Sequence, residues 1–140
     1  DKIITFYDDQ KIDLSTLKIA VWGLTFKPKT DDIREAPALT IIEALLTRGM
    51  SVHVFDPIGM ENTRQVLGDR VSYAKDERDS YGVLEGADGL AIITEWNMFK
   101  SPDFEKMKSL MKRPVVFDGR NILHPQDMKA QGFTYFGIGR

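Results

Sequence analysis

The fold is decided by residues 18–24, KIAVWGL, an apolar and β-rich run that ends in a glycine and a leucine. A short apolar run of this kind is typical of a strand that is buried on both faces of a parallel sheet. After the polar stretch 25–35, Pro37 begins a segment in which apolar residues recur every three or four positions until Gly49. This spacing predicts an amphipathic helix. Residues 51–55 predict a second strand, so the three segments form a parallel βαβ unit.

The same alternation continues along the rest of the chain. We expect further helices at 59–67, within 79–85, at 104–111 and at 125–131, and further strands at 71–74, 89–94, 115–117 and 133–136. Strands that alternate with helices predict an α/β fold, here a Rossmann-like doubly wound parallel sheet in three α/β/α layers. Ligands of such sheets bind beyond the carboxyl ends of the strands. The loops that follow residues 24, 55, 94 and 117 are therefore the candidate binding loops.

Length and composition predict one soluble globular domain. The chain has 140 residues, of which 42% are hydrophobic and 29% are charged, and this suits a single packed core. Residues 1–16 show no sustained period, so we expect a connector or a broken helix end there and a domain at 17–140. The net charge of -2 is too balanced for the basic field that non-specific nucleic-acid binding requires.

The chain contains no cysteine, which excludes disulfides, thiolate metal sites and a cysteine nucleophile. No apolar run is long enough to span a bilayer, and the first residues lack the zones of a signal peptide. We therefore expect a cytoplasmic protein without a membrane or nucleic-acid partner.

The first candidate loop does not carry a dinucleotide fingerprint. Residues 23–37 read GLTFKPKTDDIREAP, and they lack the later glycines that let a backbone approach a pyrophosphate. The sequence therefore argues against NAD bound here in the usual Rossmann mode. Two lysines and an arginine in the loop could instead donate hydrogen bonds to a phosphate or carboxylate.

This loop resembles the opening of the C-terminal domain of the UDP-glucose/GDP-mannose dehydrogenase family, in which the pattern is G-x-x-F-K-x-x-T-D-D-x-R-x-x-P. The resemblance extends through FDP at 55–57, TEW at 94–96 and FDGRN at 117–121, all in family order. It covers the chain from about residue 17 onward, and the wording is closest to the UDP-glucose branch.

The resemblance implies an oxidoreductase that converts the C6 alcohol of a nucleotide sugar to a carboxylate with two NAD molecules. In this family the NAD site lies mainly in an N-terminal domain, and a central helical region forms a homodimer. The family's catalytic cysteine also lies outside the C-terminal domain. We therefore expect this chain to bind a UDP-sugar, to have those other domains as partners, and to be inactive alone.

Three substrate-binding residues are implied by the resemblance: Phe26 through its backbone or ring, Lys27 as a charged donor and Arg120 as a two-pronged donor. The alternative for Lys27 is a solvated lysine beside a phenylalanine of the core. For Arg120 the alternative is a surface salt bridge.

Arg34 matches a family arginine that reaches NAD on the neighbouring domain. It could equally pair with Asp31 or Asp32 to shape the loop. The two aspartates lack a third ligand, so we predict no metal site. Without the fingerprint glycines, Asp56 is interpreted as a turn residue and not as a ribose ligand. The two tryptophans are assigned to the core or to a crevice rim.

A second hypothesis remains open from the residues alone. The chain could be a self-standing α/β module that uses the same loop for a different anion. It could also be the same domain from a dehydrogenase of another UDP- or GDP-sugar.

Overall fold

The computed structural model describes residues 2–25, 27–34 and 36–137. Its centre is a six-stranded parallel sheet with the strand order β3-β2-β1-β4-β5-β6. The strands are β1 (Lys18–Trp22), β2 (Ser51–Phe55), β3 (Ser72–Tyr73), β4 (Gly89–Ile92), β5 (Val115–Asp118) and β6 (Thr134–Gly137). This order is that of the doubly wound dinucleotide-type sheet, so the predicted fold class is confirmed.

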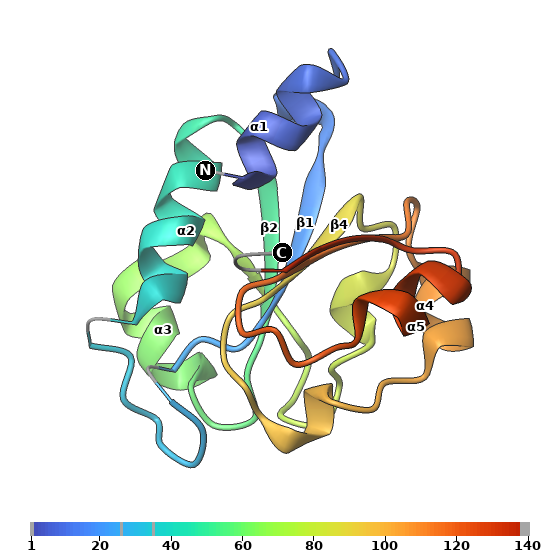
Figure 1. Cartoon of the computed structure of the whole chain (residues 1–140). Coiled ribbons are helices and arrows are strands. Elements are labelled where there is room, and N and C mark those ends of the chain that lie inside the picture. The colour runs from blue at the N-terminus through green and yellow to red at the C-terminus, as the bar shows by residue number, and fades with distance from the viewer. Residues whose placement is uncertain (1, 26, 35, 138–140) are drawn as a thin grey trace.

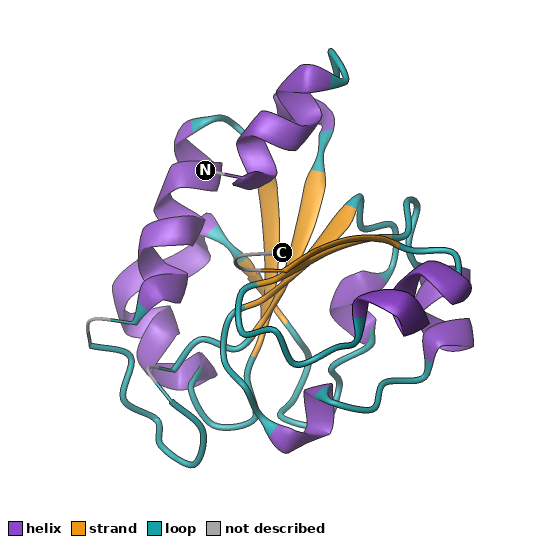
Figure 2. Ribbon diagram, viewed as in Figure 1, coloured by secondary structure: helices purple, strands orange, loops and turns teal. Residues whose placement is uncertain are grey.

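Helices cover both faces of the sheet. They are α1 (Lys2–Asp9), α2 (Pro37–Thr47), α3 (Met60–Leu67), α4 (Phe104–Leu110) and α5 (Pro125–Ala130). In Figure 1, α1, α2 and α3 lie on one side of the strands, and α4 and α5 lie on the other. Figure 2 shows the same three layers, with the sheet between two groups of helices. None of the helices in the described part of the chain has the length and apolar character needed to cross a bilayer.

The alternating side chains of β1 explain why this strand organises the fold. Ile19 and Val21 are buried in the core on the α2 side, whereas Ala20 and Trp22 are buried in the core on the α4 side. Successive side chains of a strand point to opposite faces, so a strand with four apolar residues in a row, as at 19–22, must be covered on both faces. Strand β1 also pairs with β2 on one edge and β4 on the other. Strand order reverses between β1 and β4, where sheets of this class bind their ligands.

The N-terminal segment, which was expected to be a connector or a broken helix end, contains a short helix. Residues 2–9 form helix α1, whose Ile3, Ile4 and Tyr7 are buried in the core. Its Phe6 ring packs edge-on against Phe117, and the Tyr7 hydroxyl donates to a backbone carbonyl at the start of β4. The helix has only eight residues, too few to show a sustained period in the sequence. Tertiary packing against β4 and β5 therefore decides its structure.

A second difference lies within 79–85, where a helix was expected. The structure has only the 3-10 turn Gly82–Leu84 there. The Asp79 carboxylate accepts a hydrogen bond from the Gly82 backbone N–H at 3.2 Å. Side-chain bonds of this local kind replace a helical bond and favour turns. The other predicted helices and strands are present, with ends shifted by up to two residues.

Candidate functional site

The candidate site lies at the carboxyl edge of the sheet, where the loops after β1, β2, β4 and β5 meet. Gly23 shows how closely they approach. A Cβ at this position would lie 2.5 Å from the Thr94 backbone nitrogen, and the glycine has φ of 101°. Only glycine adopts such a conformation without strain. The loops after β1 and β4 therefore touch at the point where strand order reverses.

Asp56, directly after β2, fixes the loops around it. The side chain is fully buried. One carboxylate oxygen accepts from the Leu24 backbone N–H at 2.8 Å and from the Trp96 indole N–H at 3.2 Å. The other accepts from the backbone N–H groups of Ile58 at 2.9 Å and Gly59 at 2.7 Å. A buried carboxylate is stable only when its oxygens are bonded in this way.

This geometry bears on the sequence-based interpretation of Asp56. The residue does form the turn after β2, as expected, but it also joins the loops after β1 and β4. A ribose could not reach its carboxylate, which has no exposed surface. The loop after β1 therefore lacks the glycines of a pyrophosphate turn, and the acid after β2 is not free to bind a ribose as in an NAD domain.

Lys27 lies in the loop after β1 with its side chain exposed. Its backbone carbonyl accepts a hydrogen bond from the Thr25 hydroxyl at 3.0 Å. The Thr25 carbonyl in turn accepts from the Thr94 hydroxyl at 2.8 Å, and both threonines are buried. The backbone around Lys27 is thus tied to the loop after β4, while its ammonium group faces solvent. Phe26, the other predicted substrate residue of this loop, lies outside the described residues.

Arg120 lies in the loop after β5, on the turn organised by Asp118. The Asp118 side chain is buried and accepts from the Arg120 backbone N–H at 3.1 Å, the Leu123 backbone N–H at 2.9 Å and the Tyr135 hydroxyl at 2.7 Å. The Arg120 side chain donates from Nε to the Glu95 carboxylate at 2.8 Å. This hydrogen bond lowers the pKa of Glu95 below its ordinary value. Arg120 therefore forms the ion pair that was the alternative interpretation, at the position where a substrate contact was predicted.

Arg34 is placed differently. Its side chain is 87% exposed and forms a two-pronged pair with Asp32, with Nε–Oδ1 and Nη2–Oδ2 distances of 3.0 Å each. The Asp32 carboxylate also accepts from the Arg34 backbone N–H at 2.9 Å. These hydrogen bonds lower the pKa of Asp32. The internal pairing considered for this loop is therefore present in the structure.

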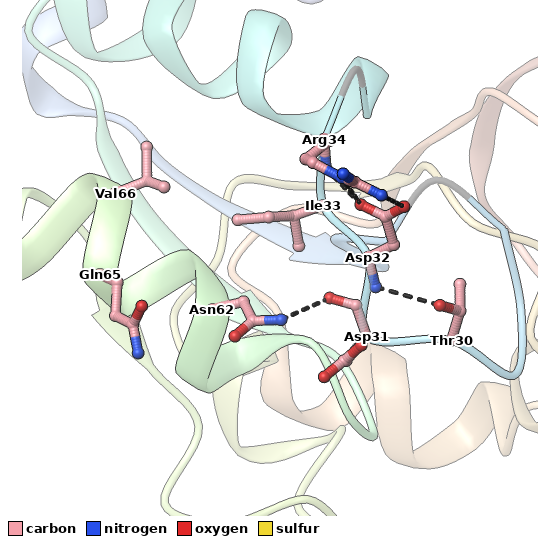
Figure 3. Close-up of a pocket in the computed structure, with 8 residues that line it drawn as sticks. All are labelled: Thr30, Asp31, Asp32, Ile33, Arg34, Asn62, Gln65 and Val66. Atoms are coloured by element: carbon pink, nitrogen blue, oxygen red, sulfur yellow. Dashed lines mark hydrogen bonds and ion pairs between the residues drawn. The ribbon is translucent and has the colours of Figure 1, made fainter.

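A surface cavity of about 540 Å³ lies between residues 30–34 of the loop after β1 and helix α3. Figure 3 shows Arg34 folded back onto Asp32, and Asn62 on α3 reaching the Asp31 carbonyl, with a donor–acceptor distance of 2.8 Å. The residues that line the cavity are Thr30, Asp31, Asp32, Ile33, Arg34, Asn62, Gln65 and Val66. Neither Lys27 nor Arg120 lines this cavity, although the charge of Lys27 also contributes to the lowered pKa of Asp32, the partner of Arg34. Within the described residues, no group of three or more histidine, aspartate or glutamate side chains could hold a metal ion.

Comparison with known proteins decides the family. The sequence profile of the UDP binding domain of the UDP-glucose/GDP-mannose dehydrogenase family matches residues 20–125. The chain belongs to this family. It is 45% identical over 124 residues to UDP-glucose 6-dehydrogenase of Pseudomonas aeruginosa, a match that covers 87% of this chain and 27% of the relative. It is 46% identical over 128 residues to the enzyme of that name from Rhizobium meliloti, covering 91% of this chain and 28% of the relative.

Solved structures agree with the sequence relatives. A UDP-glucose dehydrogenase from Pyrobaculum islandicum superposes with a TM-score of 0.71 at 34% identity, over 87% of this chain and 25% of that one. A UDP-D-ManNAc dehydrogenase from Pyrococcus horikoshii superposes with a TM-score of 0.76 at 32% identity, over 99% and 29% of the two chains. The chain thus spans less than a third of the length of these family proteins.

Several residues of this family domain were not selected from the sequence as site residues. Glu95 and Asp118 were noticed only as letters of the motifs, and Trp96 was assigned to the core or to a crevice rim, yet each bonds to a candidate binding loop. Their common signal is a side chain with a hydrogen-bonding group at the carboxyl end of a buried parallel strand or within four residues after it. That signal could have identified them, because such residues meet at one edge.

Proposed function

We propose that this chain is the UDP-sugar-binding domain of a UDP-glucose 6-dehydrogenase, and that it holds the UDP moiety at the carboxyl edge of its sheet. One observation carries the proposal. The loops after β1 and β5 present Lys27 and Arg120 at the same edge, and both are tied to the loop after β4. Cations on a fixed backbone at this edge are suited to a diphosphate.

The two cations would make different contacts. Lys27 supplies a compact charge on a flexible side chain, which can follow a phosphate oxygen. Arg120 supplies a planar fork, which can bind two oxygens of a phosphate or ribose at once. Phe26 would add a backbone or ring contact beside Lys27. The hexose itself would be recognised in large part by other domains of the enzyme.

In the complete enzyme, UDP-glucose would be oxidised to UDP-glucuronate in two hydride transfers to NAD. The residues of this chain do not fit NAD in the Rossmann mode, because Asp56 is buried and the later glycines are absent. The cofactor would therefore be held mainly by an N-terminal domain, and Arg34 would reach it from this domain. We further propose a central helical region, a homodimer and a cytoplasmic location for the complete enzyme.

UDP-glucose is the preferred substrate because the curated relatives at 45% and 46% identity carry that name. The structure of the UDP-D-ManNAc dehydrogenase is less similar in sequence, at 32% identity. A self-standing module for another anion is not favoured, since the family match covers residues 20–125.

Titration calorimetry with UDP tests the proposal on this chain. We expect weak but saturable binding, because half of a shared site keeps its charges but lacks its closing wall. Arg120→Ala should weaken it by about tenfold to a hundredfold or more, because it removes the charge and at least one charge-assisted hydrogen bond. Arg48→Ala is the matched control, since Arg48 is an exposed arginine at the end of α2, which leads into β2 at the opposite edge of the sheet. No binding of UDP at millimolar concentration would contradict the proposal.

The chain alone should not reduce NAD when UDP-glucose is added. The chain lacks the glycine-rich loop that would hold NAD for hydride transfer, and it contains no cysteine to serve as the covalent nucleophile of the second oxidation. Absorbance at the wavelength of reduced NAD is the measurement. Reproducible turnover by the purified chain would show that the assignment as a binding domain is wrong.

A further inference from the structure

The loop after β4 bonds to each of the other three loops at the carboxyl edge. Thr94 bonds to the loop after β1 and Trp96 bonds to the turn after β2. Glu95 lies between them and accepts the Nε–H of Arg120 from the loop after β5. Because its neighbours on both sides are held by other loops, the backbone of Glu95 is fixed from two directions.

The contact between Glu95 and Arg120 leaves the two terminal nitrogens of the guanidinium able to donate hydrogen bonds to a ligand. Only Nε donates to Glu95, at 2.8 Å. Among the described residues, no hydrogen bond is made by the two terminal nitrogens of Arg120. The side chain keeps 33% of its surface exposed, although its backbone N–H is bound by buried Asp118. The backbone N–H and the Nε of Arg120 are thus both held by hydrogen bonds, whereas its two terminal nitrogens make none within the described residues.

Glu95 could act on a bound anion in two opposite ways: its negative charge could repel the anion, or its hydrogen bond could order the arginine that binds it. A carboxylate near a diphosphate repels it, but Glu95 is 36% exposed, and repulsion at the surface is screened by solvent. Glu95 also does not compete for the terminal nitrogens, since it accepts only from Nε. A free arginine loses much rotamer freedom when it binds a ligand, and a partner that orders it beforehand removes that loss. We therefore expect the gain from ordering Arg120 to exceed the loss from repulsion.

We propose that Glu95 is a positioning residue for the UDP-sugar site, which holds the Arg120 guanidinium in the orientation that meets the diphosphate or ribose. The proposal rests on the proposed function of this edge, and it assigns Glu95 no contact with the substrate. Thr94 and Trp96 are the anchors that make this positioning possible.

The test is a double-mutant cycle in the complete 140-residue chain, with UDP affinity measured by calorimetry. Glu95→Ala should weaken UDP binding about threefold to tenfold, the range expected for ordering one long side chain. Glu95→Gln keeps an acceptor for Nε–H, so it should recover most of the affinity. In the Arg120→Ala background, Glu95→Ala should change the affinity less than twofold.

Glu43→Ala is the matched control. Glu43 pairs with Arg70 through two hydrogen bonds, on α2 and the turn before β3. Removing this exposed pair should leave UDP affinity unchanged. In the dehydrogenase that carries the domain, Glu95→Ala should raise KM for UDP-glucose and leave kcat and the KM for NAD unaltered.

Each other outcome overturns a different statement. Equal or tighter UDP binding by Glu95→Ala would show that Glu95 repels the anion or competes with it. An equal loss in the presence and absence of Arg120 would show that Glu95 acts independently. If the unaltered chain does not bind UDP, the proposed function fails first and this inference fails with it.

Discussion

Arg34 and Arg120 both pair with a carboxylate on loops at the carboxyl edge, but the two pairs are built differently. Arg34 pairs with Asp32, two residues away in the same loop, and its side chain is 87% exposed. Arg120 pairs with Glu95 from a different strand, and its side chain is 33% exposed. One contact shapes a loop locally, whereas the other joins two loops that are far apart in sequence.

The difference indicates what each arginine can do. A guanidinium held by distant elements is ordered before a ligand arrives, so it suits a ligand that this domain binds itself. A guanidinium held only by its own exposed loop can turn away at little cost. It suits a ligand or surface presented by another domain. This difference supports the proposal that Arg120 contacts the UDP-sugar and that Arg34 faces the proposed NAD-binding domain.

The largest expected effect is a loss of stability when Asp118, whose carboxylate holds the turn that carries Arg120, is replaced. Asp118→Ala leaves three hydrogen-bond donors without their acceptor, two of them backbone N–H groups. The free energy of unfolding should fall by about 3 kcal/mol or more, which corresponds to about 10 °C in Tm for a chain of this size. Thermal unfolding followed by circular dichroism is the measurement.

Asp32→Ala is the comparison for this change. The Asp32 carboxylate also accepts three hydrogen bonds from Arg34, but all are local and exposed. Its removal should leave Tm within about 1 °C. Similar losses for the two aspartates would show that the two arginine loops are supported in the same way, which contradicts the comparison.

Features of the fold that depend on contacts between residues close in sequence could be predicted, whereas features that depend on distant residues could not. The run 18–24 and the helix from Pro37 predicted the sheet and its layers, because an apolar strand must be covered on both faces. The packing of helix α1 on the sheet could not be predicted, since the rings of Phe117 and Phe136 that pack on its Phe6 are more than a hundred residues away in sequence. Its position depends on those partners.

The residues of the candidate site also differ in whether the sequence alone could identify them. The motif at 23–37 selected Lys27 and Arg34, and the motif at 117–121 selected Arg120. The sequence alone could not show that Glu95 pairs with Arg120, because the pairing depends on β4 and β5 lying side by side. The Asp32–Arg34 pair could be anticipated, since its two residues are neighbours in the chain.

A smaller effect is expected from Arg120→Lys, which keeps the charge but removes the fork. In the complete enzyme the KM for the UDP-sugar should rise about tenfold to a hundredfold, because one charge-assisted hydrogen bond is lost. The KM for NAD should change little. The stability of the ligand-free protein should also change little, since an exposed ion pair contributes about 1 kcal/mol or less. A loss of stability with an unaltered KM would make Arg120 a structural residue.

The smallest effect on this chain is expected from Arg34→Ala. UDP affinity measured by calorimetry should stay within about twofold, because Arg34 lines a separate cavity beside α3. The same change in the complete enzyme should raise the KM for NAD and leave that for the UDP-sugar nearly unchanged. If Arg34→Ala weakens UDP binding as much as Arg120→Ala does, the two arginines serve one ligand and the assignment to different ligands is wrong.

The most direct test of the account maps UDP on the chain by amide chemical shifts in NMR spectra. The account predicts that saturating UDP shifts the amides around Lys27, around Glu95 and around Arg120, which lie on three neighbouring loops at one edge. Amides around Arg34 and at the opposite edge around Arg48 should shift little. Shifts confined to the cavity beside α3, or spread evenly over both edges, would contradict a UDP site formed by the loops after β1, β4 and β5.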